Sequence, residues 1–367
     1  MEFIDLGAQR RRISKSLEKR ISTVLDHSKF IMGPEVAELE AELAKFVGIK
    51  HCISVANGTD ALQIAMMAAD IKPGDEIITT AFSFFATVET ILLLGAKPVF
   101  ADINPKTYNL DPTKIESLIT ARTKVILPVS LYGQCCDLDA INAVAKKHKL
   151  MVFEDAAQSF GATYKGKRSC SFTDIACTSF FPTKPLGCYG DGGACFTNND
   201  DLAAKMKMIR VHGQDRRYHH SLVGVNSRLD TIQAAILLAK LEIFEEEIAL
   251  RQKVAKKYDE ALKGFMPTPE IQADNKSVFA QYTLEVEDRD RVQSALQDLG
   301  VPTMVHYPIA MNLQPAFQKI YKEASTFSIA ESAASRVFSL PFHPYLTEND
   351  QIRVADALKK VLGTSSR

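Results

Sequence analysis

The sequence predicts an α/β fold in which a large domain with a mostly parallel sheet precedes a small C-terminal α+β domain. Short strands alternate with helical segments between residues 51 and 157. The strands include "VIL" and "MVF", which are apolar along their length, as in parallel strands buried on both faces. After about residue 229 the alternation gives way to one long helical run. We therefore place the large domain at 1–240 and the small domain at 241–367.

The large domain is expected to open with an N-terminal arm, residues 1–20. A helix is predicted at 35–47, where apolar residues recur at helical spacing. The alternation that follows predicts strands at 52–55, 75–82, 97–103, 123–130 and 150–157, and helices at 61–69, 86–95, 111–119 and 136–149. Ligands in such sheets bind just beyond the carboxyl ends of the strands, so residues there are the first candidates for a site.

The small domain is expected to be reached through a long linking helix, about 229–262, whose apolar residues continue at helical spacing. Beyond it the patterns predict a strand at 279–286, a helix at 289–300, a strand at 301–308 and two further helical stretches. This mixture is typical of a small α+β domain.

The overall charge of the chain excludes several kinds of partner. Lys+Arg and Asp+Glu both number 44, so nothing global favours a nucleic acid or an anionic membrane. The N-terminus lacks the apolar core of a secretory signal, and no apolar run reaches the roughly 18 residues that span a bilayer. Seven scattered cysteines form no CxxC pair, which favours reduced thiols and a cytoplasmic protein.

Lys184 lies in an unusual environment for a lysine. It is the only charged residue between Asp174 and Asp191, and Pro182 and Pro185 stiffen the chain on either side. Burial lowers the pKa of a lysine, and the neutral amine is a nucleophile suited to forming a Schiff base with a carbonyl. The alternative is a lysine whose stem crosses an apolar patch and whose ammonium reaches water.

Asp155 is expected at the carboxyl end of the apolar strand in "LMVFEDAA", 29 residues before Lys184. An aspartate there, followed by a reactive lysine, suggests a site for pyridoxal phosphate (PLP). A carboxylate paired with the ring nitrogen of PLP keeps that nitrogen protonated, which the cofactor needs to accept electrons. Taken alone, Asp155 is equally well explained as a helix N-cap.

"ANGTDAL" follows a strand and opens a helix, so Gly58 and Thr59 would present N–H groups to a phosphate. An ordinary capped turn is the alternative. Ser179, five residues before Lys184, would add a hydroxyl.

Residues 212–230 hold three arginines and three histidines, which indicates either an anion-binding segment or a solvated loop. We expect no metal site, because the adjacent His219 and His220 are poorly spaced to chelate one ion.

These motifs, in this order, resemble those of the DegT/DnrJ/StrS nucleotide-sugar aminotransferases. The resemblance rests on "ANGTDAL", "EDAAQSFGA", "SFFPTKPLGCYGDGGA", "GVNSRLDTIQAAIL" and "HYP", and covers essentially the whole chain. It implies the PLP-dependent transferase fold of type I, that of aspartate aminotransferase. "PVSLYGQCCDLDAINA" and residues 212–230 look most like a subgroup that aminates UDP-2-acetamido-2-deoxy-3-oxo-D-glucuronate for O-antigen biosynthesis.

The resemblance also implies a role for each matching residue. Lys184 would bind PLP covalently and then move protons, and Asp155 would pair with the ring nitrogen. Gln158 would lie beside the ring near its hydroxyl, and Phe84 would stack on the ring. The phosphate contacts would be Gly58, Thr59, Ser179 and, from the partner subunit of a homodimer, Asn226. Substrate contacts, also expected from the partner, would be Arg228, His306 and Tyr307.

The implied reaction takes an amino group from L-glutamate and gives it to a nucleotide-linked keto-sugar. Phe181 departs from the family pattern, because many relatives have His or Tyr there. Relatives that replace the lysine with histidine dehydrate sugars instead, so Lys184 favours transamination. The alternatives are an aminotransferase acting at C-3 or C-4 of another UDP-, dTDP- or GDP-linked sugar, and a non-catalytic PLP-binding regulator.

Overall fold

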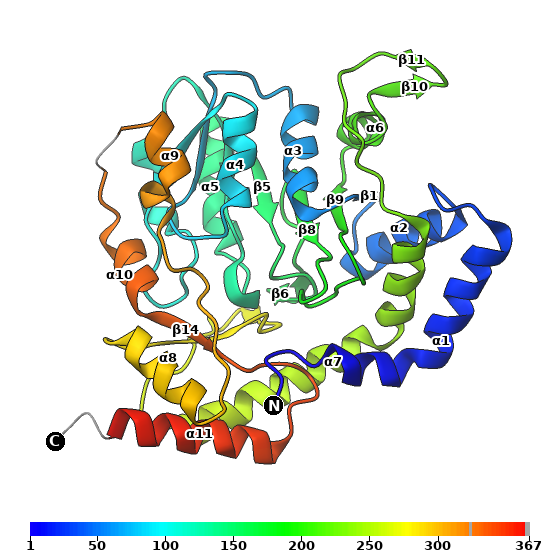
Figure 1. Ribbon diagram of the computed structural model, residues 1–367. Coiled ribbons are helices and arrows are strands. Elements are labelled where there is room, and N and C mark those ends of the chain that lie inside the picture. The colour runs from blue at the N-terminus through cyan, green and yellow to red at the C-terminus, as the bar shows by residue number, and fades with distance from the viewer. Residues whose placement is uncertain (323–324, 364–367) are drawn as a thin grey trace.

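A seven-stranded sheet forms the centre of the computed structural model, which describes residues 1–322 and 325–363 (Figure 1). The strand order is β1-β9-β8-β5-β4-β2-β3. The bounds are β1 His51–Val55, β2 Glu76–Thr80, β3 Lys97–Ala101, β4 Thr123–Leu127, β5 Met151–Asp155, β8 Ile175–Ser179 and β9 Gly193–Thr197. The strands from β8 to β3 run parallel, whereas β9 is antiparallel to both β8 and β1. The predicted α/β class with a mostly parallel sheet is confirmed.

Helices cover both faces of this sheet, and neighbouring strand residues point to opposite faces. Ile78 and Ile126 pack in a cluster with α2 (Pro34–Val47), α5 (Leu138–His148) and the first half of α7 (Thr231–Leu262). Ile77 and Val125 pack on the other side with α3 (Gly58–Ala68), α4 (Ala86–Leu93) and α6 (Asp200–Ile209). Burial on both faces explains why these strands are apolar throughout.

The 32-residue helix α7 connects this core to a second one (Figure 1). Phe244 and Ile248 belong to the sheet cluster, whereas Tyr258 and Leu262 pack with the C-terminal elements. Those elements are β13 (Tyr282–Glu285) paired antiparallel with β14 (Val337–Leu340), and the helices α8 (Arg289–Asp298) and α11 (Glu348–Gly363). The linking helix therefore exists, while the exact boundary at residue 240 stays a prediction.

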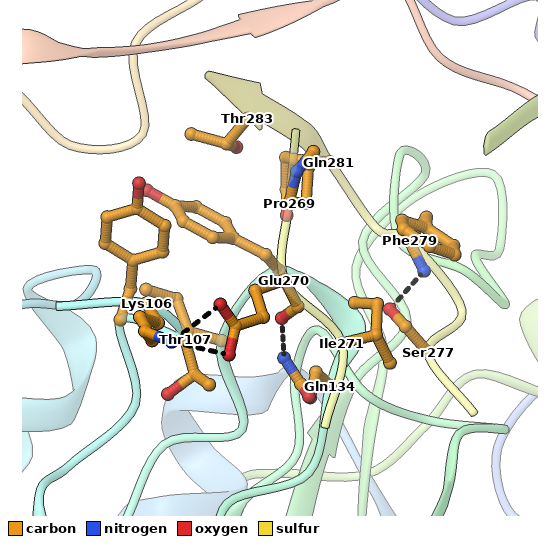
Figure 2. Close-up of a pocket in the computed structure, with 13 residues that line it drawn as sticks. Lys106, Thr107, Gln134, Pro269, Glu270, Ile271, Ser277, Phe279, Gln281 and Thr283 are labelled. Carbon is orange, nitrogen blue, oxygen red and sulfur yellow. Dashed lines mark hydrogen bonds and ion pairs between the residues drawn. The ribbon is translucent and has the colours of Figure 1, made fainter. Parts of the chain in front are cut away.

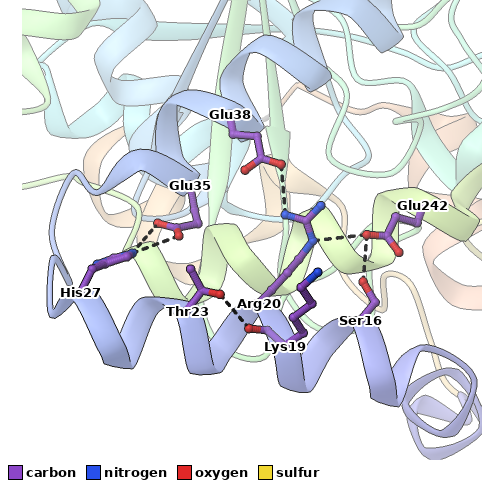
Figure 3. Close-up of polar contacts among 8 residues, drawn as sticks. All are labelled: Ser16, Lys19, Arg20, Thr23, His27, Glu35, Glu38 and Glu242. Carbon is purple, nitrogen blue, oxygen red and sulfur yellow. Dashed lines mark hydrogen bonds and ion pairs between the residues drawn. The ribbon is translucent and has the colours of Figure 1, made fainter.

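The N-terminal arm is mostly a helix, α1 (Leu6–His27), which lies along α7. Figure 3 shows the polar contacts that fasten it: Arg20 reaches both Glu242 of α7 and Glu38 of α2, and Ser16 donates to Glu242. At the end of α1, His27 contacts Glu35 at 3.0 Å. These contacts bring the first residues of the chain close to the segment that carries Lys184.

The remaining elements are short. They are β6 (Thr163–Tyr164), β7 (Lys167–Arg168), β10 (Gln214–Arg216), β11 (His219–His220), β12 (Asn275–Lys276), α9 (Pro315–Ile320), α10 (Ser328–Arg336) and four 3₁₀ turns, Pro112–Lys114, Glu116–Leu118, Leu131–Gly133 and Met311–Leu313. The hairpin of β10 and β11 protrudes at the upper right of Figure 1. In the described part of the chain, no helix is long and apolar enough to cross a membrane, and the seven cysteines are buried and unpaired.

Two predicted elements are wrong. Residues 111–119 form two 3₁₀ turns in place of a helix, and Asp111 accepts the N–H and hydroxyl of Thr113. Ile115 is fully buried, and Leu118 and Ile119 pack partly buried against the same core. So short a helix has little stability of its own, and the two 3₁₀ turns already bring these side chains to the core. Residues 301–308 form a loop with a single bridge, Met304 to Ser339, in place of a strand. That loop carries His306 and Tyr307 into the region beyond the strand ends.

Candidate active site

Lys184 lies in the loop that joins β8 to β9, beyond the carboxyl end of β8. The loop turns back on itself, because Phe180 donates its N–H to Gly192 at 2.7 Å and Lys184 donates its own to Phe181 at 2.9 Å. Burial lowers the pKa of the Lys184 ammonium, and the nearby carboxylate of Asp155 opposes this only in part. Within the described residues, Nζ has no hydrogen-bond or ion-pair partner. This arrangement favours a neutral, reactive amine.

Asp155 is the last residue of β5 and is 6% exposed. Its carboxylate accepts a hydrogen bond from the Thr87 hydroxyl at 2.8 Å and another from the Ala157 N–H at 3.2 Å. Burial raises the pKa of Asp155, and the two hydrogen bonds and Lys184 lower it in part. A cationic ring nitrogen placed against this carboxylate would relieve the cost of burying the charge.

The start of α3 meets Ser179 at the end of β8. A Cβ added at Gly58 would lie 2.7 Å from Ser179 Cβ and 3.2 Å from its Oγ, so only glycine allows this approach. Asn57 caps α3 by accepting the N–H of Asp60 at 2.8 Å, which leaves the N–H groups of Gly58 and Thr59 at the helix start. The predicted phosphate residues Gly58, Thr59 and Ser179 are thus brought together.

Gln158, Tyr307 and Phe84 gather on the same side. The Gln158 amide accepts the N–H of Tyr132 at 2.7 Å and donates to the Tyr307 hydroxyl at 2.9 Å. The rings of Phe84 and Tyr307 lie 5.8 Å apart, and Phe84 is 56% exposed despite its apolar ring. An exposed ring at the strand ends is a suitable surface for stacking another ring.

The expectation that His306 and Tyr307 act from a partner subunit is corrected by these contacts. Tyr307 contacts Gln158 and Phe84 of its own chain. His306 lies near Lys184, which together with burial lowers the pKa of its imidazole to about 4. The wrongly predicted strand at 301–308 is a loop, and its path into the site brings both residues there.

Asn226 and Arg228 follow the β10–β11 hairpin and are not joined to the groups around Lys184. Asn226 is exposed and pairs through its backbone with Val211. Between them, Ser227 accepts the N–H of Ala56, one residue before Asn57. The Nε of Arg228 is buried and, among the described residues, lacks a hydrogen-bond partner. In the hairpin, His219 contacts Asp215 and His220 contacts the His212 carbonyl.

Two residues of the site were not foreseen from the sequence. Thr87 donates to Asp155, and Tyr132 holds Gln158 through its N–H while its hydroxyl contacts the His306 carbonyl. Tyr132 also lines a separate recess of about 320 Å³, between the loops around 107 and 132 and the segment 269–283 (Figure 2). No sequence pattern points to Thr87 or Tyr132, because their contacts with Asp155 and Gln158 join segments that lie far apart in the chain.

A second recess, of about 300 Å³, lies behind the Lys184 loop. Its walls come from the loop, the N-terminal segment, α7 and residues 343–345. Within it the Gln9 amide donates to Glu247 at 2.9 Å, and Arg251 donates to the Phe279 carbonyl at 3.1 Å. From the loop, Pro182, Thr183 and Lys184 line this recess.

The residues at the strand ends fit PLP. They supply one amine whose pKa is lowered by burial, one buried carboxylate and a cradle of N–H groups and hydroxyls that an extra Cβ would fill. Lys184 would bind the aldehyde carbon, Asp155 the ring nitrogen, and Gly58, Thr59 and Ser179 the phosphate.

Comparison with known proteins agrees with this chemistry. The model of the DegT/DnrJ/EryC1/StrS aminotransferase family matches residues 11–359. A relative from Pseudomonas aeruginosa, the UDP-2-acetamido-2-deoxy-3-oxo-D-glucuronate aminotransferase, is 62% identical over 94% of this chain and 96% of its own. A family aminotransferase from Brucella abortus superposes with a TM-score of 0.95 at 42% identity, covering both chains fully.

A third similar structure is that of NtdA from Bacillus subtilis with bound cofactor PMP. It has a TM-score of 0.90 and 33% identity, and the match covers 98% of this chain and 83% of that one. The family match spans nearly the entire chain, and the site holds the groups that such chemistry requires. The chain belongs to the DegT/DnrJ/EryC1/StrS aminotransferase family and is a PLP-dependent aminotransferase.

Proposed function

We propose that this protein transfers the amino group of L-glutamate to C-3 of UDP-2-acetamido-2-deoxy-3-oxo-D-glucuronate, in cytoplasmic O-antigen biosynthesis. The observation that carries the proposal is the 62% identity, over 94% of the chain, to a relative with that activity in its name. The pairing of a buried carboxylate with a neutral lysine, Asp155 with Lys184, supports the transamination itself.

Bound PLP supplies an electron sink that makes the proton on the reacting carbon removable. Lys184 Nζ, with its lowered pKa, accepts that proton from the Cα of glutamate and later delivers a proton to the sugar carbon that receives nitrogen. Asp155 holds the ring nitrogen protonated, and the start of α3 and Ser179 hold the phosphate. The roles of these residues form part of the proposal.

Two side chains on the substrate side of Lys184, His306 and Tyr307, are uncharged near pH 7. His306 has a pKa of about 4, so it is neutral near pH 7 and acts as a hydrogen-bonding group. Burial also raises the pKa of the Tyr307 hydroxyl, which therefore keeps its proton and can donate it in a hydrogen bond. A neutral environment of this kind helps Lys184 to stay unprotonated before each proton transfer.

We further propose a homodimer in which each subunit completes the other's site. Asn226 would reach the partner's cofactor phosphate, and Arg228 would bind a carboxylate or diphosphate of the sugar nucleotide through paired N–H groups. The protruding β10–β11 hairpin and the exposure of Asn226 support contacts outside the chain.

The test follows a nitrogen label. The PLP-loaded protein is incubated with ¹⁵N-labelled L-glutamate and the 3-oxo sugar nucleotide, and the product is analysed by mass spectrometry and NMR. We expect the label on C-3 of the sugar and none with Lys184→Ala. The same assay with dTDP- and GDP-linked 4-oxo sugars is the comparison. A higher kcat/KM with one of those would replace the proposed substrate, and no label in any sugar would contradict the function.

A further inference from the structure

Thr87, on the first turn of α4, contacts the carboxylate that is expected to face the cofactor. Its hydroxyl donates to Asp155 Oδ2 at 2.8 Å, and both side chains are buried. The contact joins residues 68 positions apart, so it depends on the packing of α4 over the end of β5. A hydrogen bond donated to a carboxylate stabilises the ionised form.

The direction of this hydrogen bond is set by its neighbours. Ser83 Oγ lies 3.1 Å from Thr87 Oγ1. A hydroxyl has one proton, and an ionised Asp155 has none to give, so the proton of Thr87 goes to Asp155. Ser83 must then donate to Thr87. The result is a buried chain, Ser83 to Thr87 to Asp155, with each donor pointing toward the carboxylate.

Ser83 and Thr87 belong to the same segment as Phe84, the residue expected to stack on the cofactor ring. Phe84 lies between these two residues in the chain, beside the Tyr307 ring. The loop before α4 therefore supplies one surface for the cofactor ring, while the first turn of the helix holds the carboxylate at its edge.

We propose that Thr87 is a positioning residue that keeps Asp155 ionised and oriented, so that the ring nitrogen of bound PLP stays protonated. The inference rests on the proposed role of Asp155. Without the Thr87 hydroxyl, the carboxylate retains only the Ala157 N–H, the longer of its two hydrogen bonds. Its affinity for a proton then rises, and the proton shared with the ring moves toward the carboxylate. The other titratable groups facing Asp155 are Lys184, Tyr307, Glu154, Cys170 and Cys177.

The experiment compares three variants. Thr87→Val removes the hydroxyl and keeps the shape, whereas Thr87→Ser keeps the hydroxyl. Thr90→Val is the matched control, because Thr90 is also buried on α4 but its hydroxyl contacts the helix carbonyl of Ala86 at 3.0 Å. Circular dichroism and thermal unfolding first establish that each variant folds.

Two readouts are used, neither of which depends on turnover. In the cofactor-free protein, ¹³C NMR follows the carboxyl of Asp155 against pH. We expect Thr87→Val to raise the pKa of Asp155 by about one unit, the size of one hydrogen bond to a charged group. In protein loaded with ¹⁵N-labelled PLP, we expect the ring nitrogen to lose its proton at a lower pH in Thr87→Val. Thr87→Ser and Thr90→Val should resemble the wild type in both.

The outcomes separate this inference from the proposed function. If the wild type fails to bind PLP, or binds it with an unprotonated ring nitrogen, the role of Asp155 is wrong, whatever the variants do. If the wild type binds PLP with a protonated nitrogen and Thr87→Val leaves both titrations unchanged, the inference about Thr87 is wrong. Equal shifts in Thr87→Val and Thr90→Val would also overturn it, because they would reflect a general effect on α4.

Discussion

At the scale of single residues, the chemistry depends on burying two opposite charges without letting them pair. Lys184 and Asp155 sense one another electrostatically, yet no salt bridge forms between them, and Asp155 bonds instead to Thr87 and Ala157. A direct ion pair would raise the pKa of the lysine and occupy the carboxylate. Without a direct ion pair, burial keeps the pKa of Lys184 lowered and the carboxylate stays available to a third group, as a PLP site requires.

We expect Lys184→Ala to abolish transamination and the visible absorbance of covalently bound PLP. The loss of activity should exceed a thousandfold, because both nucleophile and proton carrier disappear. Phosphate contacts remain, so dialysed Lys184→Ala should still retain PLP non-covalently. Thr183→Ala, at an exposed neighbour in the same loop, is the control and should keep its spectrum. A Lys184→Ala protein that still transaminates would contradict the assignment.

The buried histidines predict a loss of stability in acid. Burial holds the pKa of His343 at about 4, so the folded protein favours the neutral form. The neutral, buried His343 makes its full contribution to the free energy of unfolding above the unfolded-state pKa of about 6.5. That contribution is lost as the pH falls from there toward 4. His343→Gln should remove up to about 2 kcal/mol of the pH dependence between 7.5 and 4.5. Urea unfolding of the cofactor-free protein at both pH values measures this, and equal slopes for variant and wild type would refute it.

Some residues of the site could be predicted from the sequence and others could not, for a physical reason. Asp155 could be found because it follows an apolar strand, and strand ends in a parallel sheet converge. Lys184 could be found because it is the only charged residue in an apolar stretch stiffened by two prolines. Thr87 and Tyr132 could not, because a hydroxyl or an N–H has no pattern until the fold brings it to its acceptor. His306 and Tyr307 were found through the family resemblance, which implied that they act from the partner. The contacts of Tyr307 with Gln158 and Phe84 of its own chain have no sequence pattern.

At the scale of elements, the alternation of apolar strands with helical segments was enough to predict the strands that are buried on both faces of the sheet. The five predicted parallel strands occur as β1, β2, β3, β4 and β5, although β1 pairs antiparallel at the edge. The strands β8 and β9 were missed, because "IACTS" and "GACFT" are short and surround a loop rich in glycine and proline. The helix predicted at 111–119 failed because so short a helix has little stability of its own, and two 3₁₀ turns bring its apolar side chains to the core instead.

The close contact between α3 and β8 predicts that a methyl group added at Gly58 weakens PLP binding. Gly58→Ala would place Cβ 2.7 Å from Ser179 Cβ, so the helix start and the strand end must separate. We expect PLP binding to weaken roughly 5- to 150-fold, since overpacking of this size costs about 1–3 kcal/mol. Equilibrium titration of the cofactor-free protein with PLP measures this. Gly363→Ala, where an added Cβ meets no atom within 4 Å, should bind as the wild type does. Unchanged binding by Gly58→Ala would remove α3 from the phosphate site.

At the scale of the whole molecule, one chain brings together most of the predicted site residues, but not Asn226 and Arg228. Lys184, Asp155, Gln158, Tyr307 and the start of α3 converge, whereas Asn226 is exposed and Arg228 keeps an unpartnered buried nitrogen. The hairpin beside them protrudes from the fold (Figure 1). In the proposed homodimer, a second copy of the chain would bring these two residues to the site, and the symmetry would complete both sites at once.

A mixing experiment tests whether the sites are shared. Lys184→Ala protein and an Asn226→Ala/Arg228→Ala double variant are each expected to be nearly inactive alone. If Asn226 and Arg228 act across the interface, each mixed dimer has one site free of substitutions. Random exchange of equal amounts gives half mixed dimers, and so about a quarter of the wild-type activity. If the residues act within their own chain, no mixed dimer has an intact site and no activity returns. Native mass spectrometry establishes that exchange took place, so an inactive mixture of exchanged dimers would show that each subunit uses only its own residues.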